Sequence, residues 1–230
     1  MNAANWSDLF QQLPKPHLSH FFTKSTESEF LSWIKCPKRE VRALAYLWLS
    51  DIVTLELEIR RAVAEAQSVK GLSLSGDPEA AHALFRYHAD NACYRTFALL
   101  DKASQLLNAY LGLKVERPSF KAVVQKINKS SDLSQLESVK PFLELESSEW
   151  YKALSGYRHS LSHRLSPVGQ DQTSLLALVK GLAQYLEFKP VGYSIEQLES
   201  LISGGHKRVV VIIEASEAFL RNTPAILEAR

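Results

Sequence analysis

The residues best able to do chemistry lie in one short run of the sequence, between Tyr157 and Arg164. Within it, Arg158 is followed after four intervening residues by His163. An imidazole titrates near neutral pH and can accept or donate a proton, whereas a guanidinium stays charged and can hold a phosphate through two N–H groups. Together these groups can cleave a phosphodiester bond without a metal ion. Arg158 and His163 are therefore candidates for such chemistry.

This run needs a helix to position it, and the sequence predicts one that begins near Ser148 and is stopped by Pro167. Residues five positions apart on an α-helix are separated by about 140° around the axis and about 7.5 Å along it. Arg158 and His163 of one chain therefore do not converge on one phosphate. A two-fold axis that pairs the helices of two identical chains would bring the arginine of one toward the histidine of the other. This geometry favours a homodimer with a shared cleft.

Two long segments without internal proline or glycine could form the scaffold for that helix. The first runs from Lys38 to Lys70, and its apolar residues recur at helical spacing. The second begins with Asp77 as N-cap and Pro78 in the first turn, and it ends near Leu111. Two long helices with a short connection lie antiparallel and bury one face of each. We predict an all-α fold, a helical bundle built on two long antiparallel helices plus shorter helices, with the motif on a late helix.

The shorter elements are predicted from the same periodicity and from helix-breaking residues. In chain order they are helices at 119–127 and 134–145, helix or strand at 174–188, a helix at 194–202 and a helix at 206–222. Helix is favoured for 174–188, although Gly181 weakens that interpretation. Ser194 is expected to cap the next helix, and Gly204 and Gly205 are expected to interrupt it.

The length and composition are typical of one globular domain. The chain has 230 residues, of which 46% are hydrophobic and 23% are charged. We predict a single helical domain over 1–230, with an N-terminal arm and short helices at 1–37 and the bundle core at 38–222. A formal charge of +2 argues against a protein that coats nucleic acid through bulk charge, but it allows a local basic site.

The cysteines and the apolar runs predict the compartment. Cys36 and Cys93 are too few for a disulfide framework or a cysteine-rich metal site, which favours a reducing environment. The N-terminal residues lack the basic leader and apolar core of a signal peptide. The longest unbroken aliphatic run, Val209 to Ile213, is too short to cross a bilayer. We predict a cytoplasmic protein without membrane contact.

Together with the helical pattern, the run from Arg158 to His163 resembles the motif of the HEPN superfamily (higher eukaryotes and prokaryotes nucleotide-binding). Many of its members are metal-independent ribonucleases that work as dimers. The resemblance covers roughly 38–222 in helical pattern, and the motif is its specific part. It implies an RNA substrate, with Arg158 stabilising charge on the phosphate and His163 transferring a proton at the ribose 2′-hydroxyl or the leaving oxygen. The implied products are a 2′,3′-cyclic phosphate and a 5′-hydroxyl.

Two positions depart from the pattern of the family. His159 stands where the family most often has asparagine, and it precedes His163 by four residues, on the same helix face. We regard His159 and Ser162 as auxiliary residues, with His159 either orienting His163 or binding phosphate. Leu165 stands where HEPN toxins paired with nucleotidyltransferase antitoxins carry a tyrosine, so regulation through that tyrosine is not expected. The hypothesis retains an antitoxin protein as a candidate partner, in a defence or toxin-antitoxin setting.

Other interpretations of the motif stay open. The chain could be a non-catalytic HEPN module that binds RNA, nucleotides or a protein, or it could be a purely structural helical dimer. His159 and His163 also have the four-residue spacing of a zinc pair. No glutamate follows the first histidine and no third ligand is signalled, so neither a metal nor a cofactor is expected.

The remaining polar candidates lie on the second long segment and have simpler interpretations. Asp101 lies at the edge of an apolar stripe, where it either faces the site or, more simply, pairs in solvent with a nearby Lys or Arg. His82 and His88 are isolated from the other candidates, which fits structural or exposed positions.

Overall fold

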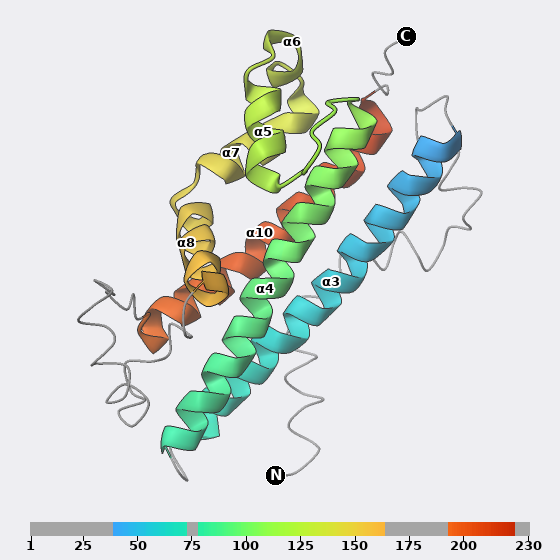
Figure 1. The fold of residues 1–230 in the computed structure, drawn as a ribbon. Helices are drawn as coiled ribbons and strands as arrows, with labels where there is room; N and C mark the ends of the chain where they lie inside the picture. Colours follow the sequence, from blue (N-terminus) through green and yellow to red (C-terminus); the bar gives the residue numbers. More distant parts are fainter. Residues whose placement is uncertain (1–38, 73–77, 164–192, 224–230) are drawn as a thin grey trace.

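The computed structural model describes residues 39–72, 78–163 and 193–223, and within these ranges it contains helices and turns but no strand (Figure 1). The predicted all-α bundle is confirmed, with two long antiparallel helices, shorter helices and the motif on a late helix. The predicted N-terminal arm at 1–37 and the segment at 174–188 lie outside the described residues.

Helices α3 (Arg39–Leu72) and α4 (Pro78–Tyr110) form the predicted hairpin. They lie side by side and antiparallel (Figure 1). Pro78 occupies the first helical position, where its missing N–H has no intrahelical partner to lose. After the other end of α4, Gly112 adopts a φ of 62°, the left-handed conformation in which glycine commonly terminates a helix. Both ends of α4 therefore follow from local sequence.

Two ion pairs and one carboxylate–imidazole contact join the two helices of this hairpin, and we call these three pairs the charge seam. Each joins an acidic residue of α3 to a basic residue of α4, and successive pairs are seven residues apart on both helices. The pairs are Asp51 with Lys102 at 2.8 Å, Glu58 with Arg95 at 3.0 Å and Glu65 with His88 at 2.9 Å. Seven residues are close to two helical turns, so the pairs follow one line. The two more exposed pairs, at Asp51 and Glu58, add little stability, but a shift of one helix by a turn would break all three pairs.

Helix α4 is the central element, because α3, α5 (Phe120–Asn128), α8 (Glu149–His163) and α10 (Ile195–Asn222) all contact it. Figure 1 shows α8 on one side of α4 and α3 on the other, with α10 crossing behind. A continuous apolar core joins these helices. Its largest fully buried side chains include Tyr110, Tyr157, Phe85, Phe120, Phe142 and Phe219. The motif helix therefore packs on the side of α4 that α3 leaves open.

The predicted helix at 134–145 is wrong. In its place the structure has a short helix α6 (Ser131–Ser134), a 3-10 turn η2 (Glu137–Val139) and helix α7 (Lys140–Ser147). The cause is Pro141, which lies in the first turn of α7. Inside a continuous helix this proline would remove a backbone hydrogen bond and clash with the preceding turn, so a new helix begins here.

The predicted interruption at Gly204 and Gly205 is also wrong, because α10 runs unbroken through both. These glycines make room for the indole of Trp150, whose atoms lie only 3.1–3.3 Å from where a Cβ would be at Gly204. Trp150 Nε1 also donates a hydrogen bond to the carbonyl of Leu201 at 2.9 Å. The Arg208 guanidinium lies over the indole, 5.1 Å from its centre. Close packing between α8 and α10 thus outweighs the low helix propensity of glycine.

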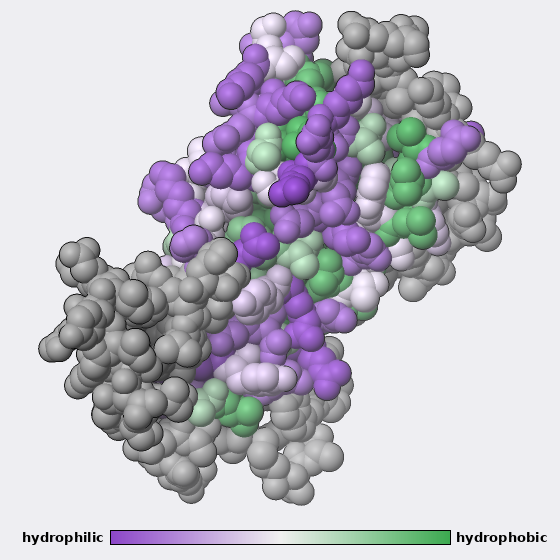
Figure 2. Space-filling view, viewed as in Figure 1, coloured by the Kyte–Doolittle hydropathy of each residue, from purple (hydrophilic) through white to green (hydrophobic). Residues whose placement is uncertain are grey.

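The visible surface is mainly polar. Figure 2 shows hydrophilic side chains over most of the described residues in this view, with an apolar patch over the N-terminal part of α3. Leu44 and Leu47 are exposed in that part of α3, at 42% and 56%. None of the described helices combines the length and the apolar character that a bilayer-spanning segment requires.

Candidate active site

Helix α8, which carries the motif, begins directly after α7 with Ser148 between them. The Ser148 hydroxyl accepts a hydrogen bond from the backbone N–H of Tyr151 at 3.2 Å and donates one to the carbonyl of Leu145 at 2.7 Å. One side chain therefore caps the N-terminus of α8 and closes the end of α7. This junction confirms the predicted start of the helix and sets the direction in which it leaves α7.

The inner face of α8 carries Tyr151, Leu154 and Tyr157, all of which are buried. The Tyr157 hydroxyl donates a hydrogen bond to the Asp90 carboxylate of α4, and its ring meets Tyr193 edge-on at 4.7 Å between centroids. Burial raises the pKa of Asp90, and the hydrogen bond from Tyr157 opposes that rise. These contacts fix the rotation of α8 about its axis, and with it the position of the next residue, the arginine of the motif.

Arg158 is exposed at the edge of this packed face. Its guanidinium carbon lies 4.3 Å from the centre of the Phe97 ring of α4. That ring stacks on Tyr151, which also contacts the ring of Phe120. Among the described residues, the guanidinium makes no hydrogen bond or ion pair. An aromatic platform thus supports the charge from one face, while the N–H groups stay open to a ligand.

Asp101 of α4 is half-buried beside this platform. Its Oδ1 accepts a hydrogen bond from the backbone N–H of Phe120 at 3.4 Å. Burial raises the pKa of this carboxyl, and the positive charge of Arg158 together with the hydrogen bond opposes the rise. Burial also raises the pKa of Tyr151 to about 12, so this phenol is uncharged at neutral pH. Asp101 is therefore close enough to the arginine of the motif for its charge to act on the carboxyl, although the described contacts include no ion pair between the two side chains.

A protein-family model matches residues 45–217, which extend from α3 through the motif into α10. It describes the Cthe2314-like HEPN family, and the match covers well over half of the chain. The chain belongs to this HEPN family. No curated protein and no solved structure matches it. The resemblance carried by the motif is therefore confirmed at the level of family and fold.

In this HEPN chain, α8 carries all four predicted site residues, Arg158, His159, Ser162 and His163. His159 is exposed. His163 is the last residue of α8, and the side chains of Ser162 and His163 lie outside the described residues. The helix is continuous over the motif, so its arginine and its second histidine start about 140° apart around the axis. The contacts that are described bring the arginine together with Phe97.

No metal site is evident in the ranges of the HEPN chain that the structure describes, where no three His, Cys, Asp or Glu residues cluster closely enough to hold an ion. Cys93 of α4 is buried. Burial raises the pKa of its thiol, so it stays protonated and unreactive at neutral pH.

Two residues of the candidate site have no distinct signal in the sequence. Phe97 has the spacing of an ordinary core residue, and only the packing of α8 on α4 makes its ring the support of the arginine. Asp90 is one of the acidic residues of α4 and becomes the partner of Tyr157 through the same packing. A tyrosine directly before the motif arginine is a weak signal for such a partner, because a buried hydroxyl needs a hydrogen bond.

Proposed function

We propose that this HEPN protein is a metal-independent endoribonuclease that acts as a homodimer, with each active site shared between the two chains. The observation that carries the proposal is the state of Arg158. Its guanidinium lies on the ring of Phe97 without a hydrogen bond to any described residue, on the same helix as His163. A phosphate bound here would gain two N–H contacts without breaking an existing ion pair of the arginine.

The proposed reaction begins when His163 takes the proton of the ribose 2′-hydroxyl. The 2′-oxygen then attacks the adjacent phosphorus, and the bond from phosphorus to the 5′-oxygen breaks. That leaving oxygen then takes a proton from His163, which is now protonated. Arg158 stabilises the charge that builds on the non-bridging oxygens. The products are a 2′,3′-cyclic phosphate and a 5′-hydroxyl, and His159 and Ser162 act as auxiliary residues, His159 by orienting His163 or by binding phosphate.

The surroundings of Arg158 support its role as a phosphate ligand. The attraction between Arg158 and the half-buried Asp101 opposes the effect of burial on the pKa of that carboxyl. The described contacts include no ion pair between the two side chains. The N–H groups of the guanidinium, which lies over the Phe97 ring of α4, therefore stay available to a ligand. Its position over the Phe97 ring also removes water from one face, which strengthens its interaction with an anion on the open side.

The setting that we propose is the cytoplasm, in a defence or toxin-antitoxin system with an antitoxin protein that holds the ribonuclease in check. An antitoxin fits the proposed activity, because a ribonuclease that is never inhibited would cut the RNA of the cell that makes it. Production of the wild-type chain in a bacterial host should slow growth, and production of His163→Ala to the same level should not. Equal growth of the two cultures would contradict a toxic role.

Cleavage of single-stranded RNA by the purified full chain in EDTA tests the catalytic proposal. Arg158→Ala and His163→Ala should each lower the rate by about 100-fold or more. Lys152→Ala is the control for the lost cation, because Lys152 is exposed on the same helix, where it pairs with Glu149. His82→Ala at an exposed position of α4 is the control for the lost imidazole. Both controls should cut like wild type.

The proposal fails if wild type and the two motif variants show the same background cleavage. RNA that is bound but not cut would instead select a non-catalytic HEPN module, the alternative that His159 in place of the usual asparagine keeps open. Neither binding nor cleavage would select a structural dimer. Mass spectrometry of the fragments provides a separate check, because the mechanism requires a cyclic phosphate on the 5′ fragment.

A further inference from the structure

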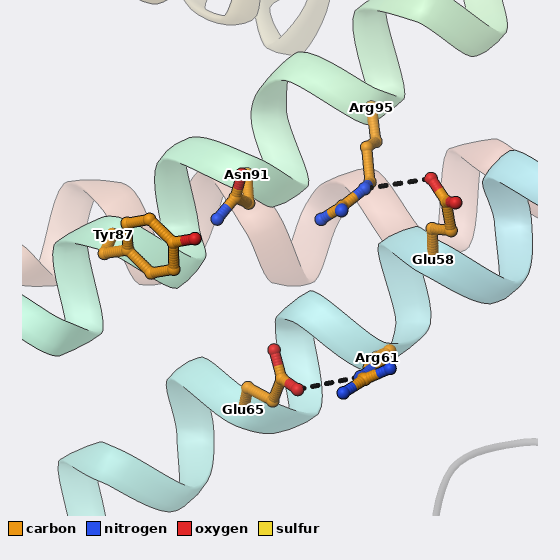
Figure 3. A pocket seen from close by; sticks show the side chains of 6 residues that line it. All are labelled: Glu58, Arg61, Glu65, Tyr87, Asn91 and Arg95. Carbon is orange, nitrogen blue, oxygen red and sulfur yellow. Dashed lines mark hydrogen bonds and ion pairs between the residues drawn. The ribbon is translucent and has the colours of Figure 1, made fainter.

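A polar hollow of about 300 Å³ opens between α3 and α4, along the charge seam (Figure 3). It is lined by Glu58, Arg61 and Glu65 of α3 and by Tyr87, Asn91 and Arg95 of α4. Figure 3 shows Asn91 and Arg95 reaching from α4 toward α3, and Glu65 reaching from α3 toward α4. The proposed cleavage reaction uses none of these side chains.

The charges that line the hollow cancel. Arg61 Nε lies 2.9 Å from Glu65 Oε1, and Arg95 Nε lies 3.0 Å from Glu58 Oε2. Two guanidinium groups thus meet two carboxylates, and no net charge remains on these four side chains to select an ion. A phosphate or a metal ion would have to break one of these pairs, whereas an uncharged ligand would not.

Several hydrogen-bonding groups of the hollow are nevertheless unused. Among the described residues, neither the Asn91 amide nor the Tyr87 hydroxyl has a hydrogen-bond partner. In the two described pairs, each arginine donates a hydrogen bond to its glutamate through Nε alone. The Nη groups of Arg61 and Arg95 can therefore donate hydrogen bonds to a ligand. The amide and the phenol can each donate and accept, and the guanidinium groups donate. These groups suit a ligand with both donors and acceptors along its edge.

Flat aromatic surface lies beside these groups. Tyr87 is 61% exposed, and its ring meets His88 edge-on at 5.2 Å between centroids. Tyr94, two turns further along α4, is 43% exposed. Asn91 and the buried Phe97, which supports Arg158, are separated by about 9 Å along the axis of α4 and by about 120° around it, with Tyr94 between them.

We propose that the hollow binds one base of a single-stranded RNA, a few nucleotides from the bond that is cut. A nucleobase is uncharged and flat, carries donors and acceptors on its edge, and stacks on tyrosine. Asn91 contacts the edge of the base, Tyr87 supplies the stacking surface, and the free Nη groups donate to its oxygens or ring nitrogens. The choice of RNA as the ligand rests on the proposed function, but the hollow contains none of the motif residues.

The experiment measures binding of the full chain to a fluorescein-labelled 2′-O-methyl RNA dodecamer by fluorescence anisotropy. The methyl group blocks the attacking oxygen, so the probe stays intact. Tyr87→Leu and Asn91→Ala should each weaken binding about tenfold. Tyr87→Phe, which keeps the ring, should weaken binding by less than about threefold. Asn128→Ala on α5 and Val211→Ala on α10 are exposed control positions, and both should bind like wild type.

The salt dependence of binding gives a second readout. Because the charges of the hollow cancel, Tyr87→Leu should leave unchanged the slope of log Kd against log salt concentration. Arg158→Ala removes a phosphate contact, so it should reduce that slope by about 0.7, the value for one contact to a single strand. A change in slope for Tyr87→Leu would mean that the hollow binds the backbone, which overturns the proposal of a base.

The possible results separate this proposal from the nuclease proposal. If Tyr87→Leu and Asn91→Ala bind the probe like wild type, the base-binding proposal is overturned even where Arg158 and His163 prove necessary for cleavage. If these variants bind weakly but wild type never cuts RNA, the role of the hollow stands and the nuclease proposal fails. An altered sedimentation mass of Tyr87→Leu with unchanged affinity would make Tyr87 a contact between protein chains, which also overturns base binding.

Discussion

A side chain that must bind phosphate has to be held in place without being neutralised. Arg158 meets both needs, because its described support is the ring of Phe97 and not a carboxylate in direct contact. A cation over an aromatic face gains about 0.5–2 kcal/mol, depending on how far it is shielded from water. A direct ion pair would hold the guanidinium more tightly, but it would occupy the N–H groups that the substrate needs.

This arrangement predicts the effect of removing the ring. Phe97→Leu should lower kcat/KM for RNA cleavage by about 3- to 10-fold, because leucine fills most of the space without attracting the guanidinium. Urea unfolding should show a loss of stability of no more than about 1.5 kcal/mol, as expected for one apolar side chain replacing another. An unchanged kcat/KM in a folded variant would show that the platform plays no part in catalysis.

The partner of Tyr157 predicts a pH effect on stability. Tyr157→Phe should destabilise the fold by about 1–2 kcal/mol at pH 7, because the half-buried Asp90 carboxylate loses its donor. Burial already raises the pKa of Asp90 above its ordinary value of 3.8, and losing the donor raises it further. The folded state therefore binds this proton more tightly than the unfolded chain, and protonation as the pH falls toward 3.8 favours folding.

The penalty of Tyr157→Phe should consequently shrink when urea unfolding is repeated at about pH 4.5. In an Asp90→Asn background, the same substitution should cost equally at both pH values, because the titrating group is gone. A penalty that grows on acidification would exclude Asp90 as the group responsible.

At the scale of helices, the elements that depend on local pattern were predictable and those that depend on distant contacts were not. The first long helix was expected at 38–70 and is found at Arg39–Leu72, because periodicity and the absence of breakers are local signals. The predicted cap at Ser194 is confirmed by a capping box with Gln197. The break expected at two glycines is absent, since Trp150 of α8 packs against them from outside α10.

The candidate site divides in the same way. Arg158 and His163 are recognisable in the sequence because their chemistry and spacing are local, and their place on a late helix is confirmed. Their catalytic roles stay a prediction. Asp90 lies 67 residues before its partner Tyr157, and no periodic signal links positions that far apart. The missing information was the packing of α8 on α4.

The close packing of Trp150 of α8 against Gly204 of α10 predicts that the two helices are coupled in stability. Gly204→Ala should destabilise the wild-type protein by about 0.5–1.5 kcal/mol, because the new methyl group would lie 3.1 Å from Trp150 Cδ1. In a Trp150→Ala background it should stabilise by up to about 1 kcal/mol, since alanine is the better helix former once the indole is gone. Urea unfolding of the four proteins measures the coupling.

Gly156 provides the control for this cycle. It lies within α8, where, of the residues that the structure describes, an added Cβ would meet the Tyr193 hydroxyl at an ordinary contact distance of 3.4 Å. Gly156→Ala should therefore be neutral or stabilising whether or not Trp150 is present. Identical effects of Gly204→Ala in the two backgrounds would show that Gly204 does not serve to make room for Trp150.

At the scale of the whole molecule, we propose that each active site is shared between two chains. The helical register places Arg158 and His163 on different sides of α8, so the proposed chemistry needs a second copy. A protein that stays monomeric at micromolar concentration would contradict the shared site. The arrangement also predicts that two inactive variants can rescue each other.

Mixing Arg158→Ala with His163→Ala, after dissociation and reassociation of the chains, should recover about a quarter of wild-type activity. About half of the dimers are then mixed, and each mixed dimer has one site that combines an intact arginine with an intact histidine. If each site were built within one chain, every site would lack one residue and no activity would return. The control is a double variant, Arg158→Ala with His163→Ala, which should restore no activity when it is mixed with either single variant, because every site then lacks at least one of the two residues.

The charge seam also limits how proteins of this kind can vary in length during evolution. Its acidic and basic residues recur every seven positions on two antiparallel helices. Deleting one residue from the middle of α3 would turn all later side chains by about 100° and remove them from the seam. Homologues should therefore gain or lose residues at 73–77, between the two helices, or by a whole heptad in both helices at once.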